Sequence, residues 1–446
     1  AVQGVGFRPT VFRLARDLDL WGWVCNSGAG ADLELEGPDV RLEQFLKRLP
    51  DELPGFAEIR SVRTRPIQPL GEVGFVIRPS QAQSPPTVRV LPDLAPCAEC
   101  LREVDDPQDR RFRYPFANCT RCGPRYSILL GLPYDRGATT MAGFALCPDC
   151  RSEYENPSDR RFHAQPVACP RCGPRLALWD SRGRTLARSD EALLRAAEVL
   201  RQGRILAMKG LGGFQLLVDA RDGSAVARLR HRKGREAKPL ALLVADLEQA
   251  ERLCCVGPEE RRLLVSQAAP IVLAQGHPNA EVAPEVAPGM SRLGIMLPST
   301  PLHHLLMREL GFPVVATSGN LSDEPLCTEE RQALQRLGGV ADMFLVHDRP
   351  IARPVDDSVV QVVAGAGQVL RSARGYAPLA LPLPDGKAAS AIILAVGGHS
   401  KSTVAVTVGT EVVVSQHLGD LDTLPSRFNF QFTLDGLADL YRLRPQ

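Results

Sequence analysis

Cysteine spacing constrains this chain more than any other feature. Eight of its twelve cysteines form four Cys-x-x-Cys pairs, and the last two pairs follow the first two by 50 residues. These cysteines are Cys97, Cys100, Cys119, Cys122, Cys147, Cys150, Cys169 and Cys172. The flanking text repeats as well, because DRRFRYPFANCTRCGPR at 109–125 returns as DRRFHAQPVACPRCGPR at 159–175. The chain therefore contains a duplicated module with the pattern Cys-x2-Cys-x18-Cys-x2-Cys.

Each copy of this pattern predicts one tetrahedral zinc ion held by four thiolates at about 2.3 Å. The copies have few apolar residues, so metal binding would supply much of their folding free energy. One zinc within each repeat is the favoured pairing, and an interleaved pairing between the repeats stays open. A disulfide framework is the less favoured alternative, because adjacent Cys-x-x-Cys pairs are typical of metal sites. A redox dithiol is also disfavoured, since one active dithiol does not need four pairs in register.

Composition narrows the class of protein. A chain of 446 residues has room for about three domains. It contains no apolar run of the roughly 18 residues that a membrane-spanning helix needs. Reduced thiols and the lack of a visible leader favour the cytosol. The net charge of +2 provides no global field for nucleic acid. The opening AVQGVGFRPT and the short last segment indicate a chain that is cut at both ends.

Hydrophobic periodicity predicts four units. Residues 1–79 read as a small α+β unit with helices at 10–18 and 40–49 and strands at 21–25, 33–36 and 74–78. In the second helix, Leu42, Phe45, Leu46 and Leu49 are expected to face inward. The predicted zinc module occupies 80–180 and begins with a Pro-rich linker at 80–96, and a short polar connector is expected at 180–189.

The third unit, 181–382, is predicted as a mixed α/β domain. It begins with a helix from Ser189 to about Gln202, followed by short strands alternating with helices. These strands are expected at 205–208, 240–244, 271–273, 314–316, 344–346 and 359–363. A linker at 381–387 would lead into a strand-rich segment at 388–446.

Lysine distribution points to an anion site in the third unit. Only six of the 53 basic side chains are lysines, and three of them lie within 209–238. Lysine ammonium groups are common phosphate ligands. A chance cluster of solvated lysines is the competing interpretation.

The first unit resembles the acylphosphatases. The carrying residues are VQGVGFR at 2–8 and GWVCNSGAG at 22–30. The resemblance implies a ferredoxin-like fold whose first strand is missing here, and a phosphate cradle at Gln3, Gly4, Val5 and Gly6. It also implies that Arg8 binds the phosphate and that Asn26 orients the attacking water. A Gly-containing loop before a helix is by itself a weak signal, although its N–H groups can bind an anion.

The third unit resembles the YrdC family of ATP-dependent enzymes. Five segments carry the resemblance: KGLGGF (209–214), LRHRKGREAKPLALL (229–243), LPSTPLHHLL (297–306), ATSGNLSDEP (316–325) and HDRPIARPVDDSV (347–359). Their charges and hydroxyls suit a triphosphate, with Mg2+, and a carboxylate-like substrate. The predicted ligands are Lys209, Arg232, Lys233, Arg235, Lys238, Ser299, Thr300, Ser318 and Asn320. Gly210, Gly212 and Gly213 would allow close backbone approach. For His303, His304 and His347, structural hydrogen bonding is favoured over metal binding or catalysis.

The last segment resembles the start of an actin-like ATPase domain related to the O-sialoglycoproteases, on LAVGGHSKSTVAV (394–406) and SQHLGDLDT (415–423). The order of the four units resembles the HypF carbamoyltransferases of [NiFe]-hydrogenase maturation. The fold class expected is therefore multidomain α+β and α/β: a ferredoxin-like acylphosphatase unit, two zinc-finger repeats, a YrdC-like domain and an incomplete actin-like segment.

This resemblance implies a reaction sequence. Carbamoyl phosphate is hydrolysed, the carbamate is joined to AMP from ATP, and the carbamoyl group passes to the C-terminal cysteine of a HypE-like partner. Two alternatives remain: a threonylcarbamoyl-adenylate enzyme of tRNA modification, and a zinc-hand binding module without catalysis. Neither the oligomeric state nor the hydrogenase served follows from the sequence.

Overall fold

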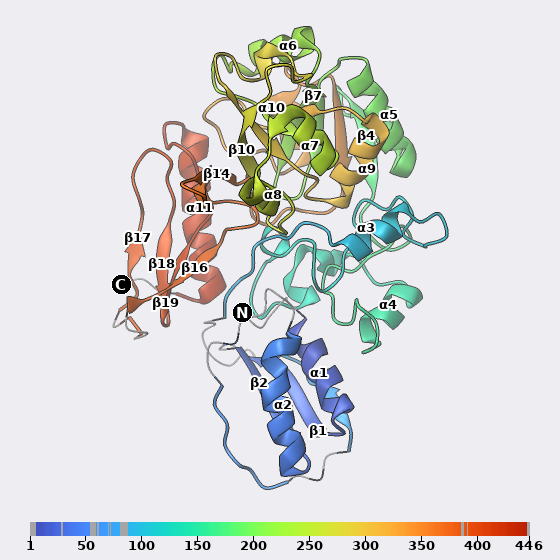
Figure 1. Cartoon of the computed structure of the whole chain (residues 1–446), viewed down its shortest axis with the longest axis vertical. Coiled ribbons are helices and arrows are strands. Elements are labelled where there is room, and N and C mark those ends of the chain that lie inside the picture. Colours follow the sequence, from blue (N-terminus) through green and yellow to red (C-terminus); the bar gives the residue numbers. More distant parts are fainter. Residues whose placement is uncertain are drawn as a thin grey trace.

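The structure, a computed structural model, describes residues 6–27, 30–53, 59, 62–69, 71, 73–80, 88–384, 388–389 and 391–443. The N-terminal unit lies at one end of the long axis, the cysteine-rich module in the middle and the large α/β unit at the other end (Figure 1). The C-terminal strands and helix α11 lie beside the last two. The molecule thus consists of four units in close contact, and two of its hydrophobic clusters combine residues of different units.

The N-terminal unit has a three-stranded sheet of order β2-β1-β3, with β1 antiparallel to β2 and parallel to β3. Its elements are α1 (Phe7–Asp17), β1 (Trp21–Ser27), β2 (Gly30–Glu36), α2 (Asp39–Glu52) and β3 (Phe75–Ile77). The predicted helices and strands are confirmed. Phe45 and Leu49 are buried as expected, but Leu46 is 44% exposed. The prediction for Leu46 was wrong because the core needs only a narrow stripe of α2.

The segment predicted as a linker, 80–96, packs against the rest of the protein over most of its described residues. Val90 and Leu94 are buried, and Leu94 pairs with Gly123 through a backbone bridge. Asp93 is 1% exposed and accepts hydrogen bonds from the backbone N–H groups of Arg125 and Ser127. A buried carboxylate needs such donors. Residues 81–87, the rest of the predicted linker, lie outside the described part of the chain.

The cysteine-rich module consists mostly of loops around two short helices. Its elements are α3 (Ala98–Asp105), η1 (Tyr126–Ile128), η2 (Arg136–Ala138), η3 (Thr140–Gly143) and α4 (Pro148–Glu155). Cys97 and Cys147 are the N-cap residues of α3 and α4. The two repeats therefore place their first cysteine pairs identically, at the start of an eight-residue helix.

The large unit is built on a twelve-stranded mixed sheet. Its strands are β4 (Leu176–Asp180), β5 (Thr185–Arg188), β6 (Leu206–Lys209), β7 (Phe214–Asp219), β8 (Ala241–Leu243), β9 (Cys254–Cys255), β10 (Ile271–Gly276), β11 (Arg292–Met296), β12 (Val314–Ser318), β13 (Met343–His347), β14 (Val359–Val363) and β15 (Ala366–Arg371). Its helices are α5 (Ser189–Arg201), α6 (Gly223–Lys233), α7 (Leu247–Leu253), α8 (Pro258–Leu264), η4 (Pro284–Val286), α9 (Pro301–Leu310) and α10 (Glu330–Leu337).

The six strands predicted in this unit are confirmed within a few residues. The polar connector expected at 180–189 was wrong, because β4 and β5 form an antiparallel hairpin on the edge of the sheet. The turn of this hairpin is polar and charged, so the hydrophobicity pattern did not reveal the short strands on either side of it.

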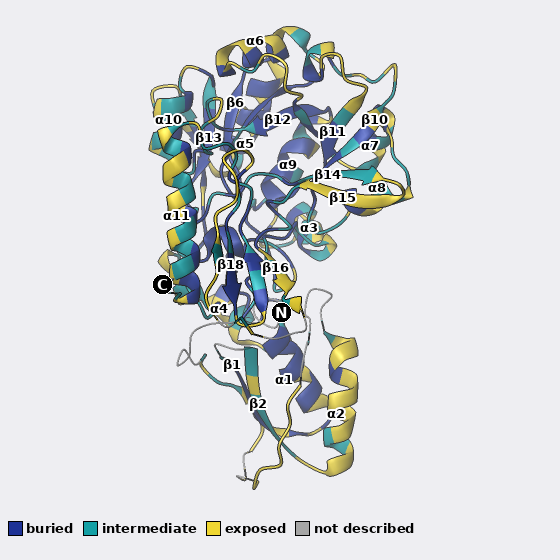
Figure 2. Cartoon of the chain, turned by 90° about the vertical axis from the view of Figure 1, so that its left-hand side faces the viewer, coloured by how far each residue is buried: buried dark blue, intermediate teal, exposed yellow. Residues whose placement is uncertain are grey.

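The C-terminal segment forms a four-stranded sheet of order β16-β19-β18-β17 with one long helix. The elements are β16 (Leu379–Pro382), β17 (Leu394–Ala395), β18 (Ala405–Val408), β19 (Glu411–Val414) and α11 (Leu424–Tyr441). The linker predicted at 381–387 begins too early, since Leu381 and Pro382 pair with β19. Residues 385–387 are not among the described ones. The side of α11 that Figure 2 shows is mainly exposed and intermediate, whereas Leu437, Leu440 and Tyr441 of this helix are buried.

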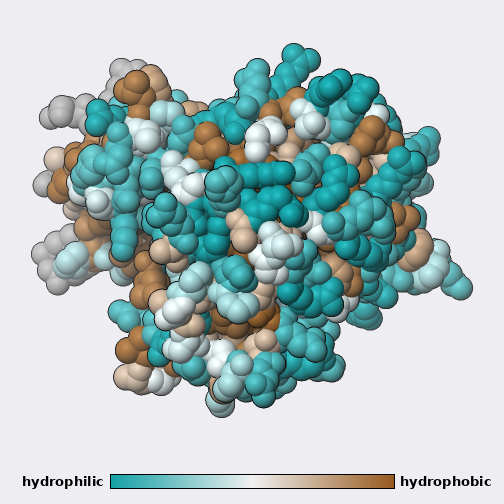
Figure 3. All heavy atoms as spheres, turned by 90° about the horizontal axis from the view of Figure 1, so that it is seen from above, coloured by the Kyte–Doolittle hydropathy of each residue, from teal (hydrophilic) through white to brown (hydrophobic). Residues whose placement is uncertain are grey.

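The interior holds two large hydrophobic clusters on the two faces of the twelve-stranded sheet and smaller clusters in the other units. The face seen from above is mostly hydrophilic, with small scattered hydrophobic groups (Figure 3). Among the described helices, none has the length and apolar character needed to cross a membrane.

Candidate functional site: two cysteine quartets and two anion-binding regions

The cysteines form two separate quartets, one within each repeat. In each quartet the four sulfur atoms lie within 4.8 Å of one another. Neighbouring sulfurs are 3.5 to 3.8 Å apart in the first quartet. Four thiolates at about 2.3 Å from a tetrahedral ion would be separated by about 3.8 Å. The quartets thus have the dimensions of metal sites, and the structure favours pairing within each repeat over the interleaved arrangement.

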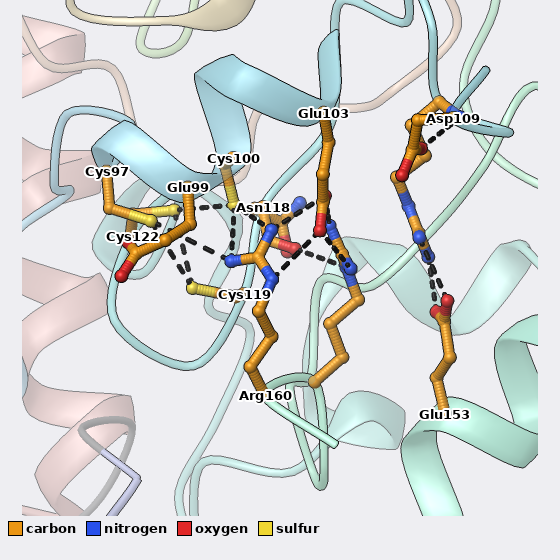
Figure 4. Close-up of polar contacts among 12 residues, drawn as sticks. Cys97, Glu99, Cys100, Glu103, Asp109, Asn118, Cys119, Cys122, Glu153 and Arg160 are labelled. Atoms are coloured by element: carbon orange, nitrogen blue, oxygen red, sulfur yellow. Dashed lines mark hydrogen bonds and ion pairs between the residues drawn. The ribbon is translucent and has the colours of Figure 1, made fainter. Parts of the chain in front are cut away.

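Each quartet is contacted by an arginine of the other repeat. Both Nη atoms of Arg160 lie 3.2 Å from the sulfur of Cys100, and Arg110 Nη2 lies 3.3 Å from the sulfur of Cys150. The next arginine in each repeat, Arg161 or Arg111, forms an ion pair with the acidic residue of the opposite helix. Figure 4 shows Arg160 reaching toward both Cys100 and Glu103.

The arginines that cross between the repeats offset part of the negative charge expected at each quartet. A divalent ion with four thiolates carries a net charge of −2. Burial alone would lower the pKa of Arg160, but the Cys100 sulfur and the Glu103 carboxylate raise it above its ordinary value. Arg160 is therefore a fixed cation beside the first quartet. The repeated DRRF text was the signal for these arginines, although the sequence alone did not show that they act across the repeats.

Arg8 and Asn26, the predicted catalytic pair, are in contact. Asn26 is 1% exposed on β1. When the side-chain amide of Asn26 is turned so that its oxygen faces Arg8, this oxygen accepts hydrogen bonds from Arg8 Nη2 and Nε at 3.2 and 3.3 Å. Gly6 adopts a φ of 81° as the N-cap of α1, a conformation that favours glycine. Gln3, Gly4 and Val5 lie outside the described residues.

Three of the predicted nucleotide ligands meet at one point. Lys233, at the end of α6, donates to the carbonyl oxygen and side-chain oxygen of Asn320 at 2.7 and 2.8 Å, and to the carbonyl oxygen of Ser318. Ser318 Oγ donates to Asn320 Oδ1 at 2.7 Å. Burial lowers the pKa of Lys233 to about 7, and the nearby Arg235 acts in the same direction. Lys238 is close by, 3.7 Å from Asp323.

Other predicted ligands are engaged elsewhere. Lys209 is 1% exposed, forms an ion pair with Glu330 and donates to two backbone carbonyl groups. Arg232 pairs with Asp342 at 2.9 Å. Thr300 caps α9 by accepting from the N–H of His303. In the structure described, these three side chains serve the fold, so their binding role stays a prediction.

The glycine segment at 210–213 borders a small cavity of about 20 Å³, which Ser299 also lines. A Cβ atom on Gly212 would lie 2.4 Å from the carbonyl oxygen of Val355, so contact within the protein already requires this glycine. The sequence did not predict three polar groups of this cavity: Gln215, Asp357 and Arg374. Arg374 and Asp357 form a buried ion pair at 2.8 Å.

The three histidines make structural hydrogen bonds, as expected. His303 contacts Gln215 Oε1 at 2.8 Å, and burial lowers its pKa to about 4. His304 contacts Asp105 at 3.0 Å, and His347 contacts the carbonyl oxygen of Gly210 at 3.2 Å. His304 thereby connects α9 with the first repeat.

Family models match all four units. The acylphosphatase model matches residues 1–77 and the HypF finger model matches 97–129 and 146–179. The Sua5/YciO/YrdC model, described as telomere recombination, matches 198–373, and the HypF Kae1-like domain model matches 388–446. The predicted multidomain fold class is confirmed.

Two HypF relatives match the whole chain, and a third protein matches part of it. The carbamoyltransferase HypF of Synechocystis sp. is 52% identical over 447 residues, which cover 100% of this chain and 58% of the relative. A crystal structure of full-length HypF in the phosphate- and nucleotide-bound form superposes with a TM-score of 0.95 at 43% identity, covering 100% of this chain and 58% of that one. The threonylcarbamoyl-AMP synthase of Bacillus subtilis is 30% identical over 158 residues, 34% of this chain and 45% of that protein.

The chain thus spans 58% of the length of the Synechocystis relative. Within that span the domain order, the cysteine quartets and the Arg8–Asn26 contact are all present. Over its whole length the chain is similar to about 58% of the length of the HypF carbamoyltransferases, and models of the HypF finger and of the HypF Kae1-like domain match two of its units.

Proposed function

We propose that this chain carries the first chemical steps of an ATP-dependent carbamoyltransferase. The steps are hydrolysis of carbamoyl phosphate at the Arg8–Asn26 site and activation of the released carbamate as carbamoyl-adenylate in the large unit. The last unit then takes part in transfer to the C-terminal cysteine of a HypE-like partner in hydrogenase maturation. One observation carries this proposal: the match to the HypF structure covers 100% of the chain with a TM-score of 0.95.

The first step uses the two side chains of the N-terminal unit. The Arg8 guanidinium binds the phosphoryl oxygens and stabilises the charge that develops on them. Asn26, fixed by Arg8, orients the water that attacks phosphorus. The bond from phosphorus to the carbamoyl oxygen breaks, and carbamate leaves with that oxygen.

The second step uses the basic segment 229–243 of the large unit and the neighbouring Ser318 and Asn320. A carbamate oxygen attacks the α-phosphorus of ATP, and pyrophosphate leaves. Arg235 and Lys238 supply positive charge, while Lys233, Ser318 and Asn320 supply hydrogen-bonding groups. Mg2+ bound to the nucleotide would offset the charge of the leaving pyrophosphate. Carbamate decomposes in water, so both steps in one chain limit its exposure.

The two quartets are proposed to bind one Zn2+ each. Their all-sulfur ligand sets and tetrahedral spacing suit closed structural sites, which support folding and leave no position for substrate. Thiolate ligands persist in a reducing compartment such as the cytosol.

Pyrophosphate exchange into ATP tests the proposal. Exchange that requires carbamoyl phosphate supports it, whereas exchange that requires threonine plus bicarbonate indicates synthesis of threonylcarbamoyl-AMP, the product named for the Bacillus relative. Absence of exchange with either substrate set would contradict both.

Arg8→Ala should lower carbamoyl phosphate hydrolysis by about two orders of magnitude, because a charge-assisted phosphate contact is lost. Arg13→Ala, which removes an exposed arginine of the same helix, is the matched control. Hydrolysis within threefold of the parent in both variants would show that Arg8 is not the phosphate ligand.

A further inference from the structure

The guanidinium of Arg8 already has an anionic partner from another unit. Asp135, which directly precedes η2 in the cysteine-rich module, lies 3.1 Å from Arg8 Nη2. The Arg8 side chain is 9% exposed and the Asp135 side chain is 36% exposed. The phosphate ligand proposed for the N-terminal unit is therefore neutralised by a carboxylate 127 residues further along the chain.

The position of Asp135 is set by the second repeat. The neighbouring Arg136 donates its backbone N–H to Gln165 Oε1 at 2.7 Å and its guanidinium to the carbonyl oxygens of Gln165 and Val167. The same repeat contacts the N-terminal unit through Phe162, whose ring lies edge-on to Phe12 with centroids 5.6 Å apart. Asp135 is thus presented to Arg8 by an anchored loop.

Among the described residues, one small cavity borders Arg8. A cavity of about 20 Å³ is lined by Arg8 and Gly6 from the N-terminal unit and by His163 and Gln165 from the second repeat. Such a volume holds about one water molecule. Asp135 does not line this cavity; its carboxylate contacts Arg8 Nη2 from outside it, at 3.1 Å.

We propose that Asp135 competes with substrate phosphate for Arg8, so that the cysteine-rich module sets the phosphate affinity of the first site. This inference rests on the proposed function, because it takes Arg8 to be the phosphate ligand. In the phosphate-free protein the carboxylate neutralises Arg8. When phosphate binds, Arg8 exchanges one anion for another and Asp135 turns toward solvent.

Asp135→Asn in the full chain tests the competition, because it removes the charge and keeps the shape of the side chain. Inorganic phosphate is the probe, and its dissociation constant is measured by calorimetry, independently of turnover. The variant should bind phosphate roughly three- to tenfold more tightly than the parent, the effect expected from deleting a partly exposed competing charge. Asp135→Glu, which keeps the charge, should remain close to the parent.

Glu155→Gln is the matched control, because it removes an exposed carboxylate from the same module. It should leave phosphate affinity unchanged, and unchanged metal content in all variants shows that the module is folded. Equal or weaker phosphate binding by Asp135→Asn overturns the inference.

Failure of the underlying function has a different signature. If Arg8→Ala binds phosphate as well as the parent does, Arg8 is not the ligand and both proposals fall. If Arg8→Ala loses phosphate while Asp135→Asn matches the parent, only the competition is wrong.

Discussion

Arg160 and Cys100 are 60 residues apart in the sequence, yet both Nη atoms of Arg160 lie 3.2 Å from the Cys100 sulfur. Arg110 makes the corresponding contact with Cys150 at 3.3 Å. Each quartet is therefore completed by a cation of the other repeat. Groups that hydrogen-bond to metal ligands tune affinity and orientation, so a metal held by either quartet would be in contact with an arginine of the other repeat.

Arg160→Gln should release metal from the first quartet about tenfold faster than the parent, since it removes a cation beside a site of net charge −2. The rate is measured on the full chain with a chromogenic chelator. Arg195→Gln is the control, because Arg195 is an exposed arginine of α5, outside the cysteine-rich module, whose ion pair is with Glu191. Equal release rates for the parent and both variants would show that the arginine contact does not stabilise the bound metal.

Asp93→Ala should lower the midpoint of thermal unfolding by several degrees. The Asp93 carboxylate accepts from the backbone N–H groups of Arg125 and Ser127 and from Ser127 Oγ, the last at 2.8 Å. Each buried donor left without an acceptor costs about 1 to 3 kcal/mol. Asp106→Ala, which removes an exposed acceptor of one backbone N–H, should shift the midpoint little. A similar midpoint for both variants would mean that residues 88–96 behave as a linker after all.

Arg235→Ala should raise the KM for ATP in pyrophosphate exchange about tenfold and leave carbamoyl phosphate hydrolysis unchanged. Arg235 is half-buried and donates to the carbonyl oxygens of Lys238 and Pro239, so it also stabilises the conformation of the loop at 235–239. Loss of one charged hydrogen bond to phosphate is worth about 1.5 to 3 kcal/mol. Arg252→Ala, on the exposed face of α7, is the control. Normal exchange in Arg235→Ala would place the nucleotide elsewhere.

Acid should destabilise the contact between the N-terminal unit and the second repeat through His163. Burial lowers the pKa of His163 from 6.5 to about 4, with Arg8 acting in the same direction and Asp135 opposing it. A depressed pKa means that the neutral ring is favoured in the folded protein. Its stabilising contribution is complete above pH 6.5, the ordinary value, and is lost as the pH falls toward about 4.

His163→Asn removes this contribution, and asparagine tolerates the φ of 54° at this position. The parent should be more sensitive than the variant to a fall from pH 7 to pH 5, by on the order of 2 kcal/mol in unfolding free energy. Unfolding midpoints at several pH values measure the difference. His231→Asn, an exposed control, should follow the parent at every pH. Parallel curves for the parent and His163→Asn would contradict the assignment.

The sequence alone predicted the elements that depend on local pattern. Periodic apolar residues gave α1 and α2, and runs of branched apolar residues gave the central strands β6, β8, β10, β12, β13 and β14. The spacing of the cysteines predicted two four-cysteine sites and favoured one within each repeat, but it left an interleaved pairing open, and the structure places each quartet within one repeat. Arg8 and Asn26 followed from the resemblance of their motifs, and the structure brings them together.

Only the tertiary structure decided which partner each charged side chain has. The DRRF text is identical in the two repeats, yet Phe162 is 4% exposed against the N-terminal unit and Phe112 is 40% exposed. Neither the crossing of Arg110 and Arg160 between the repeats nor the meeting of Asp135 with Arg8 has a local signature. Such contacts join residues far apart in the chain, and hydrophobic periodicity within one segment does not encode which distant segments meet.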